Sequence, residues 1–260
     1  PIYDIYISGS IAGFNYTYID DKMVCYYDEL PLWSSPFGVV LLNNIPLIKN
    51  STIVDIGCGT GAQTMSLAKT LKGDIIAVDL FEEFLEKLKE DSKNENITAH
   101  IETLAASMDK LPFEKEEFDI IWSEGAVYNI GFKNGINYWK EFLKPGGILA
   151  VSELSWTTNC RPKGLEDFWT GEYAEMDTIA GKIRVLEEAG YKVLGHFILS
   201  DDCWLDNYYN PLLNSHKAFM DKFGNNETAE MIVERDIQEA DFYKKYKNYY
   251  SYGFYIAQKL

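Results

Sequence analysis

Three glycines in alternation, followed by an acidic residue, are the part of this sequence best suited to hold a nucleotide. Gly57, Gly59 and Gly61 come directly after the stretch "TIVDI", and Asp79 ends the next apolar run. Because glycine has no Cβ, a ligand can approach the backbone closely. The free N–H groups where a helix begins favour an electron-rich ligand group. The pattern therefore predicts a nucleotide-like cofactor rather than a simple tight turn.

The loop is compatible with two classes of cofactor. Read as Gly57-x-Gly59-x-x-Ala62, it satisfies the dinucleotide fingerprint, in which Asp79 stands where a ribose-binding carboxylate belongs. An NAD(P)-dependent oxidoreductase is therefore one interpretation. The same glycines serve a methyl donor equally well, so the loop alone does not choose between hydride and methyl transfer.

A second group of candidate residues lies in "WSEGAVYNIGF". Glu124 is an acid at the carboxyl end of a predicted strand, where open α/β sheets bind their ligands. Its carboxylate could attract a cationic or amine substrate, act as a base, or hold an amino group of the cofactor. Tyr128 follows within a turn and could line the pocket, with simple packing as the alternative.

The residues that usually bind metals are scattered. No CxxC pair occurs and the three histidines stand far apart, so the spacing of zinc or iron–sulfur sites is missing. We expect no metal and reduced thiols. Cys58, inside the glycine loop, is expected to be a buried thiol rather than a reactive one.

Charge narrows the range of partners. Forty acidic residues against 24 basic ones give a formal net charge of -16, which repels phosphate backbones and anionic lipid. We therefore expect a small-molecule substrate, with neither nucleic acid nor membrane as a partner. The opening segment "PIYDIYISGS" lacks the basic and apolar regions of a signal peptide, and no apolar run reaches about 18 residues. These features predict a cytoplasmic protein.

The elements that must position these residues alternate between strand and helix from residue 52 onward. The predicted strands are 52–57, 74–80, 97–104, 118–125, 148–154 and 192–199, and the closing run "YYSYGFYIAQKL" suits an edge strand. The predicted helices are 62–71, 82–93, 135–144 and 176–191. This alternation indicates βαβ units with right-handed crossovers, and hence an α/β fold with a doubly wound parallel sheet.

Two segments lie outside this alternation. We expect residues 1–50 to form an N-terminal arm or lid, with a plain packing arm as the alternative, and residues at about 200–248 to form a helical cap insertion. The chain is then one domain, with a cofactor-binding core at 51–155 and the rest of the sheet at 156–260. Four tryptophans in the outer segments could build an aromatic cage, although packing is favoured: Trp33, Trp156, Trp169 and Trp204.

Four ordered motifs resemble the class I S-adenosylmethionine-dependent methyltransferases, in particular the small-molecule enzymes similar to those of ubiquinone and menaquinone biosynthesis. "VDIGCGTG" resembles their first motif and "IIAVDL" their second-strand motif. "MDKLPFEKEEFDIIWSEG" resembles the adenine loop with the fourth strand, and "LKPGGILAVSE" the turn into the fifth. The resemblance covers about residues 50–155. It implies a Rossmann-like, mostly parallel sheet of seven strands with the last one antiparallel.

The resemblance also implies a role for each matching position, with S-adenosylmethionine as cofactor. Asp55 and the loop would face the methionine end, Asp79 the ribose hydroxyls, and Leu80 the adenine. Many family members carry an Asp five residues before the "PF" pair; here Ser107 stands there, and the Met108 backbone is the expected reader of adenine. The implied cofactor-binding residues are Asp55, Gly57, Cys58, Gly59, Thr60, Gly61, Gln63, Asp79, Leu80, Ser107, Met108, Ser123 and Glu124.

The predicted activity is transfer of a methyl group from S-adenosylmethionine to a small molecule. Such a transfer is an in-line displacement, so the protein mainly has to position and desolvate a nucleophile. A base is needed only where the acceptor must lose a proton early. Glu124 and Tyr128 are the candidates for catalysis. The alternatives are the NAD(P)-dependent oxidoreductase and a non-catalytic cofactor-binding module.

Overall fold

The computed structural model describes residues 51–260, apart from 71–72, 96, 98 and 224–226. The predicted arm at 1–50, with Trp33, lies outside the described residues. One mixed sheet runs through the described part in the order β3-β2-β1-β4-β5-β8-β7, and a two-residue strand pairs with β5. Its strands are β1 (Ser51–Ile56), β2 (Gly73–Asp79), β3 (His100–Ala105), β4 (Phe118–Ser123), β5 (Leu143–Trp156), β6 (Asp177–Thr178), β7 (Tyr191–Ile198) and β8 (Tyr250–Lys259).

The strand order reverses between β1 and β4, which lie next to each other and run parallel. The pairs β1–β2, β2–β3 and β4–β5 are also parallel. A crevice at the carboxyl ends of β1 and β4 is where open α/β sheets bind ligands. β8 runs antiparallel to both of its neighbours, which confirms the expected antiparallel last strand.

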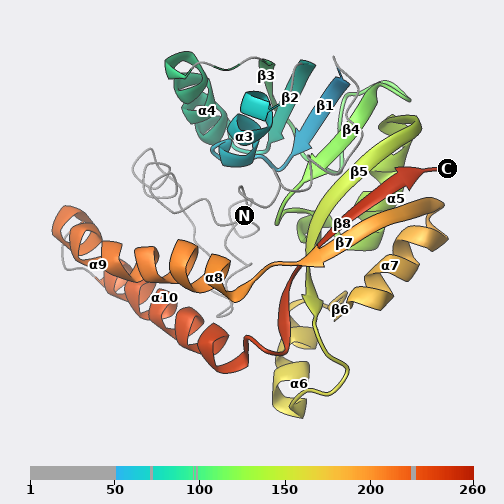
Figure 1. Cartoon of the computed structure of the whole chain (residues 1–260). Helices are drawn as coiled ribbons and strands as arrows, with labels where there is room; N and C mark the ends of the chain where they lie inside the picture. Colours follow the sequence, from blue (N-terminus) through green and yellow to red (C-terminus); the bar gives the residue numbers. More distant parts are fainter. Residues whose placement is uncertain (1–50, 71–72, 96, 98, 224–226) are drawn as a thin grey trace.

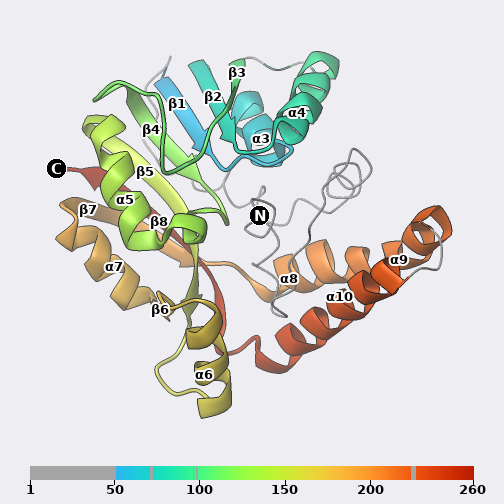
Figure 2. The ribbon, with the colours of Figure 1, turned by 180° about the vertical axis from the view of Figure 1, so that it is seen from behind.

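Helices cover both faces of the sheet (Figures 1 and 2). The successive residues Ile53 and Val54 of β1 point to opposite faces and are buried in two different core clusters, so this strand is apolar on both sides. The α-helices are α3 (Ala62–Thr70), α4 (Glu82–Asn94), α5 (Phe132–Trp139), α6 (Lys163–Glu172), α7 (Ile179–Glu188), α8 (Asp201–Trp204), α9 (Asn210–Phe223) and α10 (Glu227–Tyr246). Short turns of other helix types are η1 (Val127–Ile130), η2 (Lys140–Phe142) and η3 (Leu205–Tyr209).

One sequence expectation about the sheet is wrong. The closing run forms β8, which is not an edge strand but lies between β5 and β7. Gly253 of β8 allows close packing, because a Cβ at this position would lie 2.6 Å from the Tyr255 hydroxyl. The edge is β7, whose Leu194 and Ile198 are exposed. Neither α6 nor β6 was predicted, and the strand predicted at 148–154 begins earlier, at Leu143.

The helices α8 to α10 fill the range in which the sequence predicts an insertion between the last two strands. Figures 1 and 2 show α9 and α10 side by side, extending away from the sheet. Trp204 fastens this unit to β8, because its indole stacks on Tyr252 at 5.5 Å and donates a hydrogen bond of 2.9 Å to Ser251. Trp156, Trp169 and Trp204 are all buried in one core cluster, which confirms packing rather than an exposed aromatic cage for these three.

Candidate functional site

The three loop glycines all have positive φ, but each has a different reason to be glycine. A Cβ at Gly57 would lie 2.5 Å from the Ala126 Cβ, and one at Gly61 would overlap Leu88 of α4. Gly59 has φ +56 and no atom within 4 Å of its would-be Cβ. Two glycines therefore allow close packing. The third leaves the outer side of the loop open for a ligand.

Asp79 holds this loop against the end of β2. Its Oδ2 accepts a hydrogen bond from the Gly59 N–H at 2.9 Å, and its Oδ1 accepts one from the Phe81 N–H at 3.0 Å. The Gly57 and Cys58 N–H groups bond the Val78 carbonyl at 2.8 and 3.0 Å. These hydrogen bonds fix the Asp79 carboxylate in place. The residue is almost fully buried, with only 1% of it exposed.

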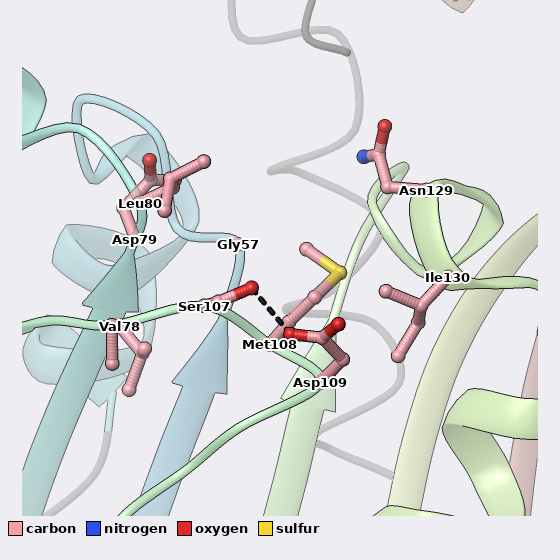
Figure 3. A pocket seen from close by; sticks show the side chains of 10 residues that line it. Gly57, Val78, Asp79, Leu80, Ser107, Met108, Asp109, Asn129 and Ile130 are labelled. Atoms are coloured by element: carbon pink, nitrogen blue, oxygen red, sulfur yellow. Dashed lines mark hydrogen bonds between the residues drawn. The ribbon is translucent and has the colours of Figure 1, made fainter. Parts of the chain in front are cut away.

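A cavity of about 120 Å³ lies beside the loop (Figure 3). Five residues expected from the sequence line it: Gly57, Asp79, Leu80, Ser107 and Met108. Five more were missed: Val78, Ala106, Asp109, Asn129 and Ile130. Asp109 is in the predicted adenine loop and could have been found from its carboxylate. Asn129 and Ile130 belong to η1, which reaches the cavity only through the tertiary fold.

The adenine loop offers polar groups to this cavity. The Ser107 hydroxyl donates to Asp109 Oδ1 at 2.5 Å, so a carboxylate stands beside the expected serine (Figure 3). The Met108 carbonyl accepts a hydrogen bond from the Trp139 indole at 2.9 Å. The backbone group of Met108 that remains to hydrogen-bond adenine is therefore its N–H. The thioether side chain of Met108 extends into the cavity (Figure 3).

Asp55 is a buried acid beneath the loop. Its Oδ2 accepts a hydrogen bond from the Thr64 hydroxyl at 2.6 Å, whereas no hydrogen-bond partner among the described residues reaches its Oδ1. Burial, and secondarily the charges of Glu124 and Asp79, raise the pKa of Asp55 to about 8. A buried carboxyl oxygen without a partner suits a cationic amino group such as that of S-adenosylmethionine. Thr60 and Gln63 do not line the cavity and are half-buried nearby.

The remaining predicted residues are held by their own contacts. The Ser123 hydroxyl donates to the Ile56 carbonyl at 2.9 Å and so ties β4 to β1. Glu124, 7% exposed, accepts a hydrogen bond of 2.7 Å from the Trp122 indole. Cys58 is buried, as expected, and its burial raises the pKa of the thiol well above the ordinary value, so that little of the reactive thiolate forms.

Tyr128 is half-buried on η1, between β4 and α5 in the chain. Burial, followed by the nearby charge of Glu153, raises its pKa to about 12. At neutral pH Tyr128 is therefore a neutral phenol that can donate a hydrogen bond. A catalytic role for Tyr128 or Glu124 stays a prediction.

Within the described residues, no cluster of three or more histidine, cysteine, aspartate or glutamate side chains is arranged to bind a metal ion. None of the helices described is both long and apolar enough to cross a membrane.

Comparison with known proteins decides which cofactor the loop serves. Residues 53–147, from β1 into β5, match the family model described as a methyltransferase domain. The chain therefore carries an S-adenosylmethionine-dependent methyltransferase domain. The match includes the glycine loop, Asp79 and the adenine loop, and no comparison supports the oxidoreductase alternative.

Relatives of this methyltransferase differ in how much of the chain they match. The sarcosine/dimethylglycine N-methyltransferase of Aphanothece halophytica is 24% identical over 232 residues, or 84% of this chain and 82% of its own length. The ubiquinone/menaquinone biosynthesis C-methyltransferase of Wigglesworthia glossinidia brevipalpis is 32% identical over 133 residues. That alignment covers only 46% of this chain and 51% of the relative.

Solved structures confirm the fold. A S-adenosylmethionine-dependent methyltransferase from Geobacter sulfurreducens, in complex with S-adenosyl-L-homocysteine, superposes with a TM-score of 0.75 at 14% identity. The superposition covers 89% of this methyltransferase and 92% of the other chain. The similarity therefore extends well beyond the residues that the family model matches.

Proposed function

We propose that this methyltransferase methylates the nitrogen of a small amine. The observation that carries the proposal is Glu124, a buried carboxyl that follows β4 and accepts a hydrogen bond from the Trp122 indole. A buried carboxylate is stabilised by a cationic ligand. The relative that aligns over 84% of the chain is named as an N-methyltransferase of sarcosine and dimethylglycine, which supports the same acceptor class.

The cofactor half of the site lies along the cavity of Figure 3. S-adenosylmethionine, when bound, supplies a methyl group activated by a sulfonium. Asp79 would accept hydrogen bonds from the ribose hydroxyls, and Leu80 and Ile130 would cover the adenine. The Asp109 carboxylate would accept from the adenine amino group, with Ser107 holding it in place at 2.5 Å. Asp55 would pair with the methionine ammonium.

The acceptor half would begin at Glu124. Its carboxyl attracts a cationic amine, and the indole of Trp122 fixes its orientation through the 2.7 Å hydrogen bond. Tyr128, as a neutral phenol, can donate a hydrogen bond to the acceptor but is a poor base. Positioning and water exclusion would then contribute more than proton abstraction by these two residues.

The experiment uses labelled S-adenosylmethionine with a panel of small primary, secondary and tertiary amines. Catechols and quinols are included as oxygen and carbon acceptors. Label should appear in amine products and not in the other acceptors. Transfer to a quinol or catechol alone would replace the amine by another acceptor class. Binding of S-adenosyl-L-homocysteine without transfer to any acceptor would favour the non-catalytic module.

A further inference from the structure

A second cavity, of about 250 Å³, lies beside the start of α5 and is separate from the cofactor cavity. The two cavities share no lining residue, although Ile130 lines the first and Phe132 the second. Residues of α5, of α7 and of the segment 174–177 line the second cavity, and Figure 2 shows both helices on the same face of the sheet. It therefore offers space for a ligand other than the cofactor.

Lys182 of α7 stands at the buried end of this cavity. It and Phe132, which also lines the cavity, are each only 1% exposed. The Lys182 ammonium donates a hydrogen bond of 3.2 Å to the Tyr173 hydroxyl and lies over the rings of Phe132 at 4.6 Å and Tyr173 at 4.9 Å. An ammonium has three N–H donors, and among the described residues only this hydroxyl accepts from it. Lys182 can therefore donate to a ligand as well.

An anion at the buried end of the cavity would stabilise Lys182. A desolvated ammonium is costly without a charged partner, and no carboxylate of the described residues lies within 4.0 Å of this one. Burial accordingly lowers the pKa of the Lys182 amine, although the more distant charges of Glu153, Glu175 and Asp177 act in the opposite direction. A ligand carboxylate would supply the direct partner that these residues do not.

The outer end of the cavity carries the opposite charge. Asp177 is exposed and Glu175 is half-buried, and both line the cavity together with the exposed Lys133. Glu175 Oε2 accepts a hydrogen bond from the Lys133 backbone N–H at 3.0 Å, and Asp177 Oδ1 accepts one from the Thr178 N–H at 2.6 Å. A carboxylate can accept more than one hydrogen bond. The outer end therefore suits a cationic group and repels a second anion.

The rest of the lining is apolar. An enclosed cavity of about 150 Å³ is large enough for benzene. A cavity of about 250 Å³ therefore has room for a small apolar group together with two charged groups. The residues that would contact the apolar group form the apolar wall of the cavity: Phe132, Ala174, Met176 and Val185.

We infer that this second cavity binds a free α-amino acid with a small apolar side chain. The carboxylate of the amino acid pairs with Lys182, its ammonium lies toward Glu175 and Asp177, and its side chain contacts the apolar wall. A zwitterion matches both ends of the cavity, whereas Lys182 repels a simple amine and the outer end does not hold a simple carboxylate. The site is distinct from the acceptor position beside Glu124 and does not depend on which acceptor is methylated.

The first experiment compares three probes by ligand-observed NMR titration, with S-adenosyl-L-homocysteine saturating. L-valine is the amino acid, isovalerate lacks its ammonium, and isobutylamine lacks its carboxylate. Isobutylamine should bind at least about tenfold more weakly than L-valine, because a hydrogen bond to a charged group is lost. Isovalerate should bind about fivefold more weakly, because exposed ion pairs contribute less. Equal binding of L-valine and isovalerate, or no binding of L-valine at millimolar concentration, would overturn the inference.

The second experiment changes each end of the cavity in turn. K182M should weaken binding of L-valine about 10- to 100-fold. D177N should weaken it about two- to fivefold and leave isovalerate unaffected. Because Asp177 is exposed, D177N keeps the inference testable if K182M does not fold. Calorimetry with S-adenosyl-L-homocysteine shows which variants are folded. Unchanged binding of L-valine in folded K182M, or in D177N, would contradict the assignment of that end.

Lys140 provides the matched control for K182M. Its ammonium also lies over an aromatic ring, that of Tyr191 at 5.3 Å, but it donates to the Ala189 and Gly190 carbonyls and does not line the cavity. K140M should leave the affinity for L-valine unchanged. Binding that is lost in E124Q but kept in K182M would place the amino acid at the acceptor position and overturn the inference. None of these titrations requires methyl transfer, so they fail or succeed independently of the proposed function.

Discussion

At the scale of the residue, Asp79 combines two functions that are usually considered separately. Its carboxylate fastens the glycine loop through Gly59 and Phe81, and the same group is proposed to hold the ribose. A replacement that removes the carboxylate therefore disturbs loop and ligand together. One that keeps its shape removes the charge and one of the two acceptors, because an amide nitrogen cannot accept a backbone N–H.

The variants D79A and D79N separate these effects. D79A should weaken binding of S-adenosyl-L-homocysteine by on the order of 1.5 to 3 kcal/mol, the scale of hydrogen bonds to charged groups. D79N should weaken it less, because the amide oxygen can still accept the Gly59 N–H. Calorimetry measures both. Equal dissociation constants for D79A and the wild type would place the ribose elsewhere.

Asp55 makes the stability of the ligand-free protein depend on pH. Folded Asp55 has a pKa of about 8, against 3.8 for an ordinary Asp, so between these values the folded state holds a proton that the unfolded chain has lost. The free energy of unfolding should therefore fall as pH rises from about 4 to 8.

The replacement D55N removes this proton uptake while keeping an acceptor for Thr64. Urea unfolding at pH 5, 6.5 and 8 should show a shallower decline for D55N than for the wild type. A decline of the same slope in both proteins would mean that Asp55 is already ionised when folded.

The residues of the candidate site differ in whether the local sequence predicts them. Gly57, Asp79, Leu80 and Met108 follow from motifs read along one strand and its turn, because those motifs encode local backbone geometry. Asn129 and Ile130 reach the cavity only because η1 folds over the ends of the strands. No sequence pattern predicts that η1 lies over the ends of the strands.

At the scale of the element, Gly61 sets how closely α3 and α4 pack. G61A would place a methyl group against Leu88 and force a left-handed backbone at φ +89 on alanine. We expect a loss of about 2 to 4 kcal/mol in the free energy of unfolding.

Gly171 of α6 is the control for that substitution, because no atom lies within 4 Å of its would-be Cβ and its backbone is ordinary. G171A should leave stability unchanged or raise it by up to about 1 kcal/mol. Chemical denaturation of both variants measures the contrast. Similar stability of G61A and G171A would show that α3 can move away from α4 without cost.

Trp204 is one of the contacts between the helical insertion and the sheet. It stacks on Tyr243 at 4.6 Å and on Tyr252 at 5.5 Å. W204A should cost about 3 to 5 kcal/mol, and W204F less, because a benzene ring is kept while the pyrrole part of the indole and its bond to Ser251 are lost. Thermal unfolding, followed by circular dichroism, measures whether W204A is the less stable variant. Equal stability of the two variants would assign the energy to the pyrrole part and its hydrogen bond.

The elements were predicted well where one physical signal dominates. The continuous apolar runs of β1 and β2 are typical of strands buried on both faces, and the spacing of Phe84, Leu85 and Leu88 predicted α4. The position of β8 was predicted wrongly. Alternation along a strand reports which side chains point inward, but it does not report whether a second strand pairs on its far edge.

At the scale of the whole molecule, the net charge of -16 opposes compaction. Raising NaCl from about 0.1 to 1 M shortens the Debye length from about 10 to 3 Å. The melting temperature at pH 7 should rise by several degrees, and the rise should shrink near the isoelectric pH of 4.6. Calorimetric scans at both pH values test this, and an equal salt effect at both would point to salting-out instead.

The place of β8 also has a consequence for synthesis on the ribosome. β7 leaves the ribosome some fifty residues before β8, yet its only ladder in the described sheet is with β8. Until Tyr250–Lys259 emerges, β5 and β7 have a strand-wide gap between them, and the helices from Asp201 to Tyr246 are complete first. β7 can therefore join the sheet only together with β8 or after it.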